Sequence, residues 1–163
     1  MLRGAVKVAI LAVVLYKAAE TALKFGVHLR YNKHYPGDCR QVKGLDYGSE
    51  DLQITQDGIA FITSGIWFQS LPSSFNEFMK TNNIQGNIYL FDFNQQELGA
   101  RKLKIKPSKG FNLESFHPHG ISLLEDRVKG EHLLYVVNHA GENDAVEKFR
   151  YLPKTNELVH LKS

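Results

Sequence analysis

The sequence contains a single cysteine, Cys39, among its 163 residues. One cysteine cannot form a disulfide within this sequence, so in a secreted chain it indicates either a partner elsewhere or an exposed thiol. Another interpretation is that Cys39 is buried and acts as a small apolar side chain. The sequence also lacks the Asn-x-Ser/Thr acceptor of N-glycosylation, so sugar attachment gives no information on export.

Long hydrophobic runs are absent as well. The uninterrupted apolar run at residues 8–16 is far short of the roughly 20 residues that span a bilayer comfortably. Flanking lysines could recruit residues 18–23 into a marginal span. Arg3 and Lys7 precede the run, and a basic start followed by a short apolar stretch is typical of a secretory signal. The sequence therefore predicts the secretory pathway and an extracellular or membrane-associated location.

The residues after this run favour a retained helix. Glu20 and Lys24 form a favourable pair at helical spacing, and no small-x-small cleavage site is evident. We therefore expect residues 1–25 to form an uncleaved signal or anchor helix. A conventional signal peptide, cut near Ala19 or Ala22, is the alternative.

A basic folded face is also missing. Residues 1–45 contain eight Lys or Arg and two acidic residues, whereas residues 46–163 contain twelve and fifteen, a net charge of −3. Proteins that bind nucleic acid usually concentrate basic residues on their folded surface. We therefore expect no nucleic-acid partner.

The rest of the chain shows short apolar runs and no long helical pattern. Residues 26–45 have no sustained period and predict a connecting arm. From residue 46 onward, runs rich in Val, Ile, Phe and Tyr alternate with glycine-containing turns, which predicts an all-β body over residues 46–163.

Two cycles of four predicted strands can be aligned within this body. The pairs are residues 50–54 with 120–124, 59–64 with 133–138, 87–93 with 146–152, and 97–102 with 157–162. Four antiparallel strands per cycle are typical of a propeller blade, and propellers usually need at least four blades to close. The sequence therefore predicts the first two blades of a β-propeller, and a complete eight-stranded sandwich is the competing interpretation.

Residues 69–85 interrupt the strand pattern. They contain Pro72, Phe75, Phe78 and Met79 and predict a loop that acts as a lid or an anchor. A surface insertion whose aromatic side chains fill a small satellite core is the alternative.

Four side chains suited to calcium binding or proton transfer stand at the starts and ends of predicted strands. Glu50 and Asp51 are adjacent carboxylates, and on an extended backbone they point to opposite sides, so one pair could serve two calcium ions. His119 lies between a proline and a glycine, and His139 ends an apolar run. Histidine is the side chain best suited to moving protons at neutral pH.

The segments around these residues resemble the paraoxonase/arylesterase family of calcium-dependent esterases and lactonases, which forms six-bladed propellers. The matching stretches are Gly-Ser-Glu-Asp-Leu at residues 48–52, Gly-Ile-Ala-Phe-Ile-Thr-Ser-Gly at 58–65, His-Pro-His-Gly-Ile-Ser at 117–122 and Val-Val-Asn-His at 136–139. The resemblance covers only the front of that family's fold. It implies a lipid, membrane or lipoprotein surface as the partner of the retained N-terminal helix.

The resemblance also implies roles for individual residues. Glu50 would contact a catalytic calcium, and Asp51 with the main-chain carbonyl of Ile121 would contact a structural calcium. His119 would be the proton-accepting base, assisted by His139. Cys39 would form a disulfide with a cysteine near the far C-terminus of the family fold, which this sequence does not contain. His117 replaces a residue that is usually Asn in the family, so we expect it to be structural.

The function implied is hydrolysis of small aryl esters and lactones. The family's remaining calcium ligands have no counterpart in this sequence, so we expect a truncated form that binds calcium weakly and has little activity alone. Two alternatives are a non-catalytic, membrane-anchored propeller that serves as a scaffold or assembly partner, and a truncated translation product without a stable fold.

Overall fold

The computed structural model describes residues 2–29, 39–45, 48–65, 72–140 and 144–163. It contains two compact units, Met1–Arg40 and Gln41–Ser163. Residues 30–38 of the expected arm and residues 69–71 of the expected loop lie outside the described residues.

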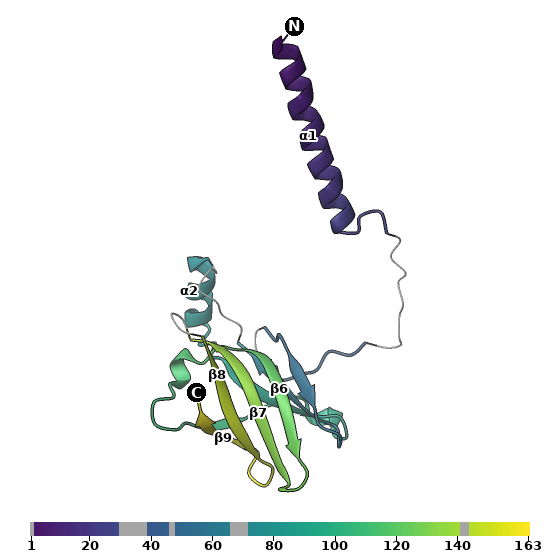
Figure 1. Cartoon of the computed structure of the whole chain (residues 1–163). Helices are drawn as coiled ribbons and strands as arrows, with labels where there is room; N and C mark the ends of the chain where they lie inside the picture. Colours follow the sequence, from purple (N-terminus) through teal and green to yellow (C-terminus); the bar gives the residue numbers. More distant parts are fainter. Residues whose placement is uncertain (1, 30–38, 46–47, 66–71, 141–143) are drawn as a thin grey trace. The chain divides into compact units, whose positions relative to one another are not determined.

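The first unit contains the helix that the N-terminal sequence predicts, α1 (Leu2–Lys24; Figure 1). Glu20 pairs with Lys17 at 2.7 Å and with Lys24 at 2.8 Å, which are the i,i+3 and i,i+4 contacts that stabilise a helix surface. Within the described residues, no helix combines the length and apolar character needed to cross a membrane.

The second unit contains two sheets, and each includes a four-stranded antiparallel meander. The first sheet has the order β1 (Leu52–Ile54), β2 (Ile59–Ser64), β3 (Asn87–Asp92) and β4 (Arg101–Lys102). The second has the order β5 (Lys104–Lys106), β9 (Glu157–Lys162), β8 (Asp144–Leu152), β7 (Glu131–His139) and β6 (Pro118–Asp126). The sequence did not predict β5, which runs parallel to β9 at the sheet edge.

The main core lies between the two sheets, which stack face to face (Figure 1). Alternation along β7 places Leu134 and Val136 in this core, where both are fully buried. The buried residues of this core are Phe61, Ile88, Leu90, Leu103, Ile105, Phe116, Ile121, Leu134, Val136, Phe149, Tyr151 and Leu158. A smaller cluster on the other face of the first sheet packs against Val42 and Leu45.

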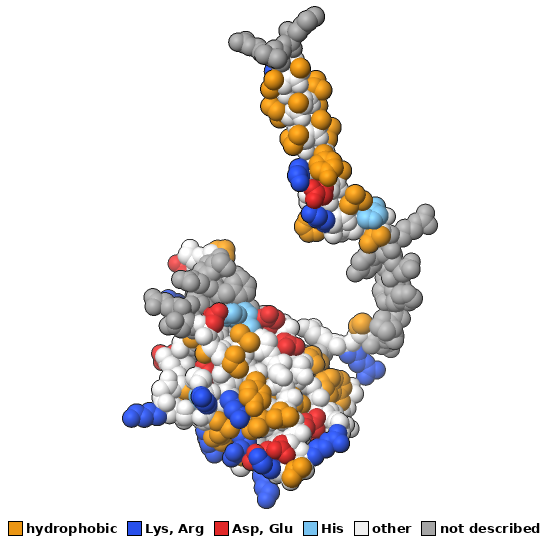
Figure 2. Space-filling view, viewed as in Figure 1, with side chains coloured by type: hydrophobic (Ala, Val, Ile, Leu, Met, Phe, Trp, Pro, Cys, Tyr) orange, Lys and Arg blue, Asp and Glu red, His pale blue; other side chains and the backbone are white. Residues whose placement is uncertain are grey.

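The outer face of the second sheet is less well covered. Leu124 on β6, Val146 on β8 and Leu161 on β9 are exposed. Figure 2 shows apolar side chains on this face, interspersed with charged ones. The outer face of the second sheet therefore carries both charged and apolar side chains, and the described residues do not bury it.

The expected loop at residues 69–85 contains a helix, α2 (Ser73–Thr81), so the prediction was wrong over those residues. Pro72 stands directly before the first turn, where its fixed φ suits a helix start. Met79 is the buried residue of α2, whereas Phe78 is 42% exposed. The short helix is thus held in place mainly by the buried side chain of Met79 and less by its aromatic side chains.

The strand predicted at residues 97–102 is also shorter than expected. Its first residues form a 3₁₀ helix, η1 (Gln96–Leu98), and only the two residues of β4 are extended. Gly99 has a φ of 68°, which ends the helix and breaks the strand pattern. The backbone N–H of Ala100 then donates to the carbonyl of Lys43 at 2.7 Å, so this segment is held by the first residues of the same unit.

Candidate active site

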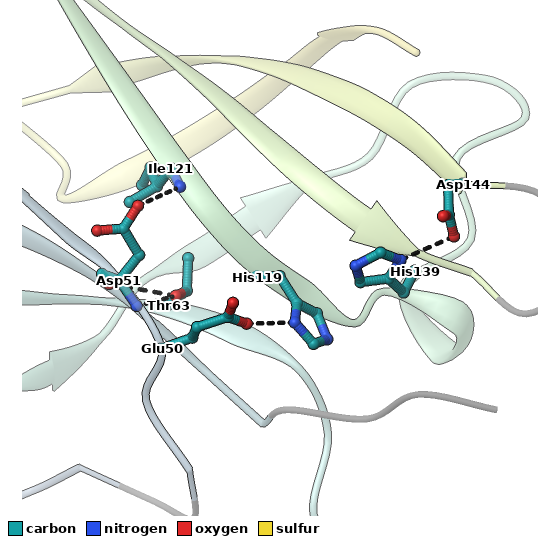
Figure 3. Close-up of polar contacts among 7 residues, drawn as sticks. All are labelled: Glu50, Asp51, Thr63, His119, Ile121, His139 and Asp144. Carbon is teal, nitrogen blue, oxygen red and sulfur yellow. Dashed lines mark hydrogen bonds and ion pairs between the residues drawn. The ribbon is translucent and has the colours of Figure 1, made fainter. Parts of the chain in front are cut away.

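Asp51 lies directly before β1 and connects the two sheets. Its backbone carbonyl accepts the N–H of Thr63 on β2 at 3.0 Å. Its carboxylate Oδ2 accepts the backbone N–H of Ile121 on β6 at 2.9 Å (Figure 3), and Oδ1 accepts the N–H of Leu52 at 2.8 Å. The structure thus brings Asp51 and Ile121 together through the Ile121 N–H; the role predicted for the Ile121 carbonyl stays a prediction.

Glu50 reaches a different group from its neighbour. Its carboxylate Oε2 contacts Nδ1 of His119 (Figure 3). The Glu50 side chain is 48% exposed, whereas that of His119 is 7% exposed. The contact therefore joins a carboxylate at the surface to an imidazole that is almost enclosed.

The position of His119 depends on an irregularity between β6 and β7. Pro118 pairs with Asn138, but the next pair is Ile121 with Val136, so β6 contains one extra residue at this point. Such a bulge redirects the side chains beside it. The rings of His119 and His139 meet here, with centroids 4.3 Å apart and planes at 85°.

His139 is held by a carboxylate of its own. Its Nδ1 lies 2.8 Å from Oδ1 of Asp144, the first residue of β8 (Figure 3). An ionised carboxylate can only accept hydrogen bonds, so the proton on each ring belongs to the Nδ1 that faces a carboxylate. In both His119 and His139 the basic nitrogen of the neutral ring is then Nε2.

His117 borders a cavity beside this site. The cavity has a volume of about 490 Å³ and is lined by Asn76, Met79, Lys80, Asn83, Ile84, Gln85, Glu114 and His117. Burial lowers the pKa of His117, and the positive charge of a protonated His119 lowers it further, so His117 is neutral at pH 7. Its predicted structural role stays a prediction.

The carboxylates near β1 have the right chemistry for calcium. Calcium prefers six to eight oxygen ligands, and Glu50 and Asp51 line a depression of about 200 Å³ together with Ser49, Leu52 and Ile62. In the described parts of the chain, however, no three His, Cys, Asp or Glu side chains gather as a metal site. The ligand type fits calcium, and both the calcium sites and the expected weak binding stay predictions.

The five predicted site residues at 50, 51, 119, 121 and 139 therefore lie together at one edge of the two sheets.

Cys39 belongs to the first unit, Met1–Arg40. Cys39 is exposed, so the interpretation as a buried apolar side chain was wrong. Its disulfide stays a prediction.

Two residues of the site were missed by the sequence analysis. Asn138 directly precedes His139, and its side-chain oxygen accepts the backbone N–H of His117 at 2.8 Å. A polar residue at an inward position of β7 could have signalled this role, because that position alternates with Leu134 and Val136. Asp144 had no such signal, since it meets His139 as its cross-strand partner in the β7–β8 ladder, and that register is not visible in the sequence.

The fold is that of a β-sheet protein built from two meanders. At one edge of the sheets two histidines each face a carboxylate, and such a site is suited to proton transfer. The sequence profile of the arylesterase family matches residues 32–163. The chain is 35% identical over 159 residues to serum paraoxonase/arylesterase 2 of Gallus gallus, covering 95% of this chain and 42% of that protein. It is 40% identical over 126 residues to serum paraoxonase/arylesterase 1 of Homo sapiens, covering 77% and 33%.

A third relative is serum paraoxonase/lactonase 3 of Oryctolagus cuniculus, which is 39% identical over 128 residues, covering 78% of this chain and 34% of that protein. The protein belongs to the paraoxonase/arylesterase family. It spans between about a third and two fifths of the length of these relatives.

Proposed function

We propose that this protein is a calcium-dependent hydrolase of aryl esters and lactones. The observation that carries the proposal is the contact between the rings of His119 and His139, whose centroids are 4.3 Å apart. Nδ1 of each ring also faces a carboxylate, that of Glu50 for His119 and that of Asp144 for His139. The names of the relatives, which are arylesterases and lactonases, support the substrate class.

In this proposal His119 acts as the general base. The Glu50 carboxylate keeps the proton on Nδ1, so Nε2 takes a proton from the water that attacks the carbonyl carbon of the ester or lactone. His139 lies against the same ring, and its own Nδ1 is held by Asp144. We assign His139 the role of assisting His119 by stabilising the proton that His119 has accepted. The low exposure of His119 limits competition from bulk water.

Calcium would be bound by oxygen atoms beside the start of β1. Glu50 would contribute to a catalytic site, and Asp51 with the Ile121 carbonyl would contribute to a structural site. Bound calcium would polarise the carbonyl of the substrate and stabilise the negative charge that forms on its oxygen. The further ligands would come from segments found in the longer relatives.

We also propose that the two sheets are neighbouring blades of a propeller. The first strand of each meander, β1 and β6, lie in contact, as inner strands of adjacent blades would. The exposed apolar residues on the outer face of the second sheet, Leu124, Val146 and Leu161, would pack against a third blade. The length of the relatives supports this arrangement.

The proposed cellular setting is the secretory pathway, with an extracellular or membrane-associated protein. Helix α1 would be the retained segment that contacts lipid, membrane or lipoprotein surfaces, since its apolar residues Ile10, Val13 and Val14 are exposed. Cys39, which is exposed, would form a disulfide with a cysteine of a longer form.

The test of function uses the matching part of a longer relative. Residues 39–163 replace the corresponding segment of human serum paraoxonase/arylesterase 1, and hydrolysis of phenyl acetate and a δ-lactone is measured with calcium. We expect hydrolysis, and a loss of about 100-fold or more in kcat for His119→Gln. His132→Gln is the matched control, because His132 pairs with Glu125 at the far end of β7.

Undiminished activity of His119→Gln towards every ester and lactone would contradict the proton-relay role. A folded chimaera without any hydrolysis would favour the alternative of a non-catalytic, membrane-anchored scaffold. The 163-residue chain measured in parallel would show how much activity it has alone, which we expect to be little.

A further inference from the structure

Three polar side chains are buried on the inward face of the second sheet. Asn138 on β7 is 3% exposed, Glu147 on β8 is 3% exposed and His160 on β9 is 4% exposed. Glu147 Oε1 accepts from Nδ2 of Asn138 at 3.0 Å, and Oε2 lies 2.8 Å from Nε2 of His160. Ser108 Oγ lies 2.7 Å from Nδ1 of His160. Asn138, Glu147, His160 and Ser108 thus form one hydrogen-bonded chain of side chains, the buried line. Buried polar groups are costly unless they are hydrogen-bonded, so these residues stabilise the fold only as a connected set.

The carboxylate of Glu147 fixes the orientation of the Asn138 amide. A carboxylate accepts hydrogen bonds, so the NH₂ group of Asn138 must face Glu147. The amide oxygen of Asn138 then faces the other way, where it accepts the backbone N–H of His117 at 2.8 Å. The buried line therefore continues from Ser108 to the backbone two residues before His119.

This contact lies where the ladder between β6 and β7 is irregular. Pro118, which is paired with Asn138, has no N–H to donate, and the next pair beyond the bulge is Ile121 with Val136. The N–H of His139 donates to the carbonyl of His117 at 3.1 Å, and the Asn138 side chain accepts the His117 N–H. These two bonds hold the backbone before the bulge, from which the His119 ring reaches His139.

The geometry points to Glu147 and His160 as positioning residues for the histidine pair: they orient Asn138, and Asn138 sets the placement of the His117 to His119 backbone against His139. Phe111 stacks on the His160 ring at 4.1 Å with an angle of 15°, which holds that imidazole in plane to face Glu147. The inference rests on the proposed function for its consequence in catalysis, but the geometric link can be measured without activity.

The test uses nuclear magnetic resonance on the full chain. The ring protons of His119 and His139 should give a mutual cross-peak, and ¹⁵N shifts of their side chains should report protonation at Nδ1. We expect Glu147→Leu to abolish the cross-peak in a chain that circular dichroism shows to be folded. Glu147→Gln should keep it, because a glutamine can accept from Asn138 through its oxygen and donate to His160 through its NH₂ group.

Tyr151→Phe is the matched control. Tyr151 lies on the same inward face of β8, and its hydroxyl donates to Oδ1 of Asn156 at 2.7 Å. The change removes a hydrogen bond from the same strand without touching the histidine pair, so the cross-peak should remain. Should Glu147→Leu fail to fold, Asn138→Ala tests the same link and should also abolish the cross-peak, because it removes both amide contacts and leaves the Glu147 and His160 pair in place.

Several results would overturn the inference. A cross-peak and imidazole shifts that are unchanged in Glu147→Leu or Asn138→Ala would show that the line does not position the histidines. Loss of the cross-peak in Tyr151→Phe would show a general loosening of the sheet. Covalent labelling of Ser108 by a fluorophosphonate, abolished in His160→Gln, would show that the line is a nucleophilic triad instead.

Activity of the chimaera separates this inference from the proposed function. If the chimaera is active, Glu147→Leu should lower kcat by about 100-fold with little change in KM, and Glu147→Gln should restore most of it. If the chimaera is inactive but the cross-peak depends on Glu147 as described, the proposed function fails and the positioning inference stands. An active Glu147→Leu chimaera with unchanged kcat would overturn the inference alone.

Discussion

Asp51 and Ile121 join the two sheets, since Oδ2 of the Asp51 carboxylate accepts the Ile121 backbone N–H at 2.9 Å. Ile121 is 5% exposed, so its N–H would have no ready access to water if the carboxylate were removed. This contact makes Asp51 a structural residue of the sheet interface, whatever its role towards calcium.

We predict that Asp51→Ala lowers the free energy of unfolding by about 1–3 kcal/mol, the cost of leaving a buried donor unsatisfied. Urea denaturation of the 163-residue chain would measure it. Asp51→Asn is the control, because its amide oxygen can still accept the Ile121 N–H. A change within about 0.5 kcal/mol for Asp51→Ala would contradict this account of the interface.

We predict that Gly86→Ala is strongly destabilising. A Cβ at Gly86 would lie 1.9 Å from the carbonyl oxygen of Phe116 and 2.4 Å from Cδ of Pro118, so the backbone leading to His119 would have to move. We expect a loss of about 3 kcal/mol in the free energy of unfolding. Gly120→Ala is the matched control, because the nearest atom to its added Cβ is 3.8 Å away. Equal melting temperatures for the two variants would refute the prediction.

We predict that Glu147 makes the stability depend on acid pH. Burial acts to raise the pKa of this carboxyl, but hydrogen bonds from Asn138, Ser163 and His160, with the charge of His160, outweigh burial and lower the pKa. The stabilisation is therefore complete above the unfolded pKa of about 4.3 and is lost as the pH falls through the lower, folded value.

The free energy of unfolding measured from pH 7 to pH 3 should thus fall less steeply for Glu147→Gln than for the unmodified chain. Glu97→Gln, which removes an exposed carboxylate, should leave the slope of the unmodified chain in place. Identical slopes for Glu147→Gln and the unmodified chain would show that the buried carboxylate does not contribute in this way.

We predict that the 163-residue chain binds calcium more weakly than about 10⁻⁴ M, because Glu50 and Asp51 supply too few oxygen atoms. Calorimetric titration would measure the affinity, and Asp51→Ala should weaken it further. The control is Glu97→Gln, which changes the net charge equally at a distant exposed position. Binding near about 10⁻⁶ M that Asp51→Ala abolishes would contradict the prediction.

Much of the sheet structure could be predicted from local patterns. The runs at residues 59–64 and 157–162 coincide with β2 and β9, because short apolar runs bounded by turn residues favour a strand whatever lies around them. The helix at Ser73–Thr81 was missed although Phe75, Phe78 and Met79 stand at the i, i+3, i+4 spacing of an apolar stripe, because nine residues are few for that pattern to distinguish a helix from a loop. Strand β5 was missed because its pairing partner, β9, lies about fifty residues away.

Some members of the candidate site were identified from the sequence, but Asn138, Asp144 and the contacts were not. Glu50, Asp51, His119 and His139 were identified from their motifs, and all four lie at one edge of the sheets. That Glu50 pairs with His119, and that Asp144 pairs with His139, could not be predicted, because the first contact depends on the bulge in β6 and the second on the register of β8 against β7.

The order of amino acids alone determined the alternating strands, the N-terminal helix and the stretches that mark the family, because these depend on neighbours a few positions apart. Only the folded structure determines that Asn138 connects the buried Glu147 to the backbone of His117, and that two carboxylates each contact Nδ1 of an imidazole. Those contacts require strands from different parts of the chain to meet in one register, and that register is set by burial of the shared core.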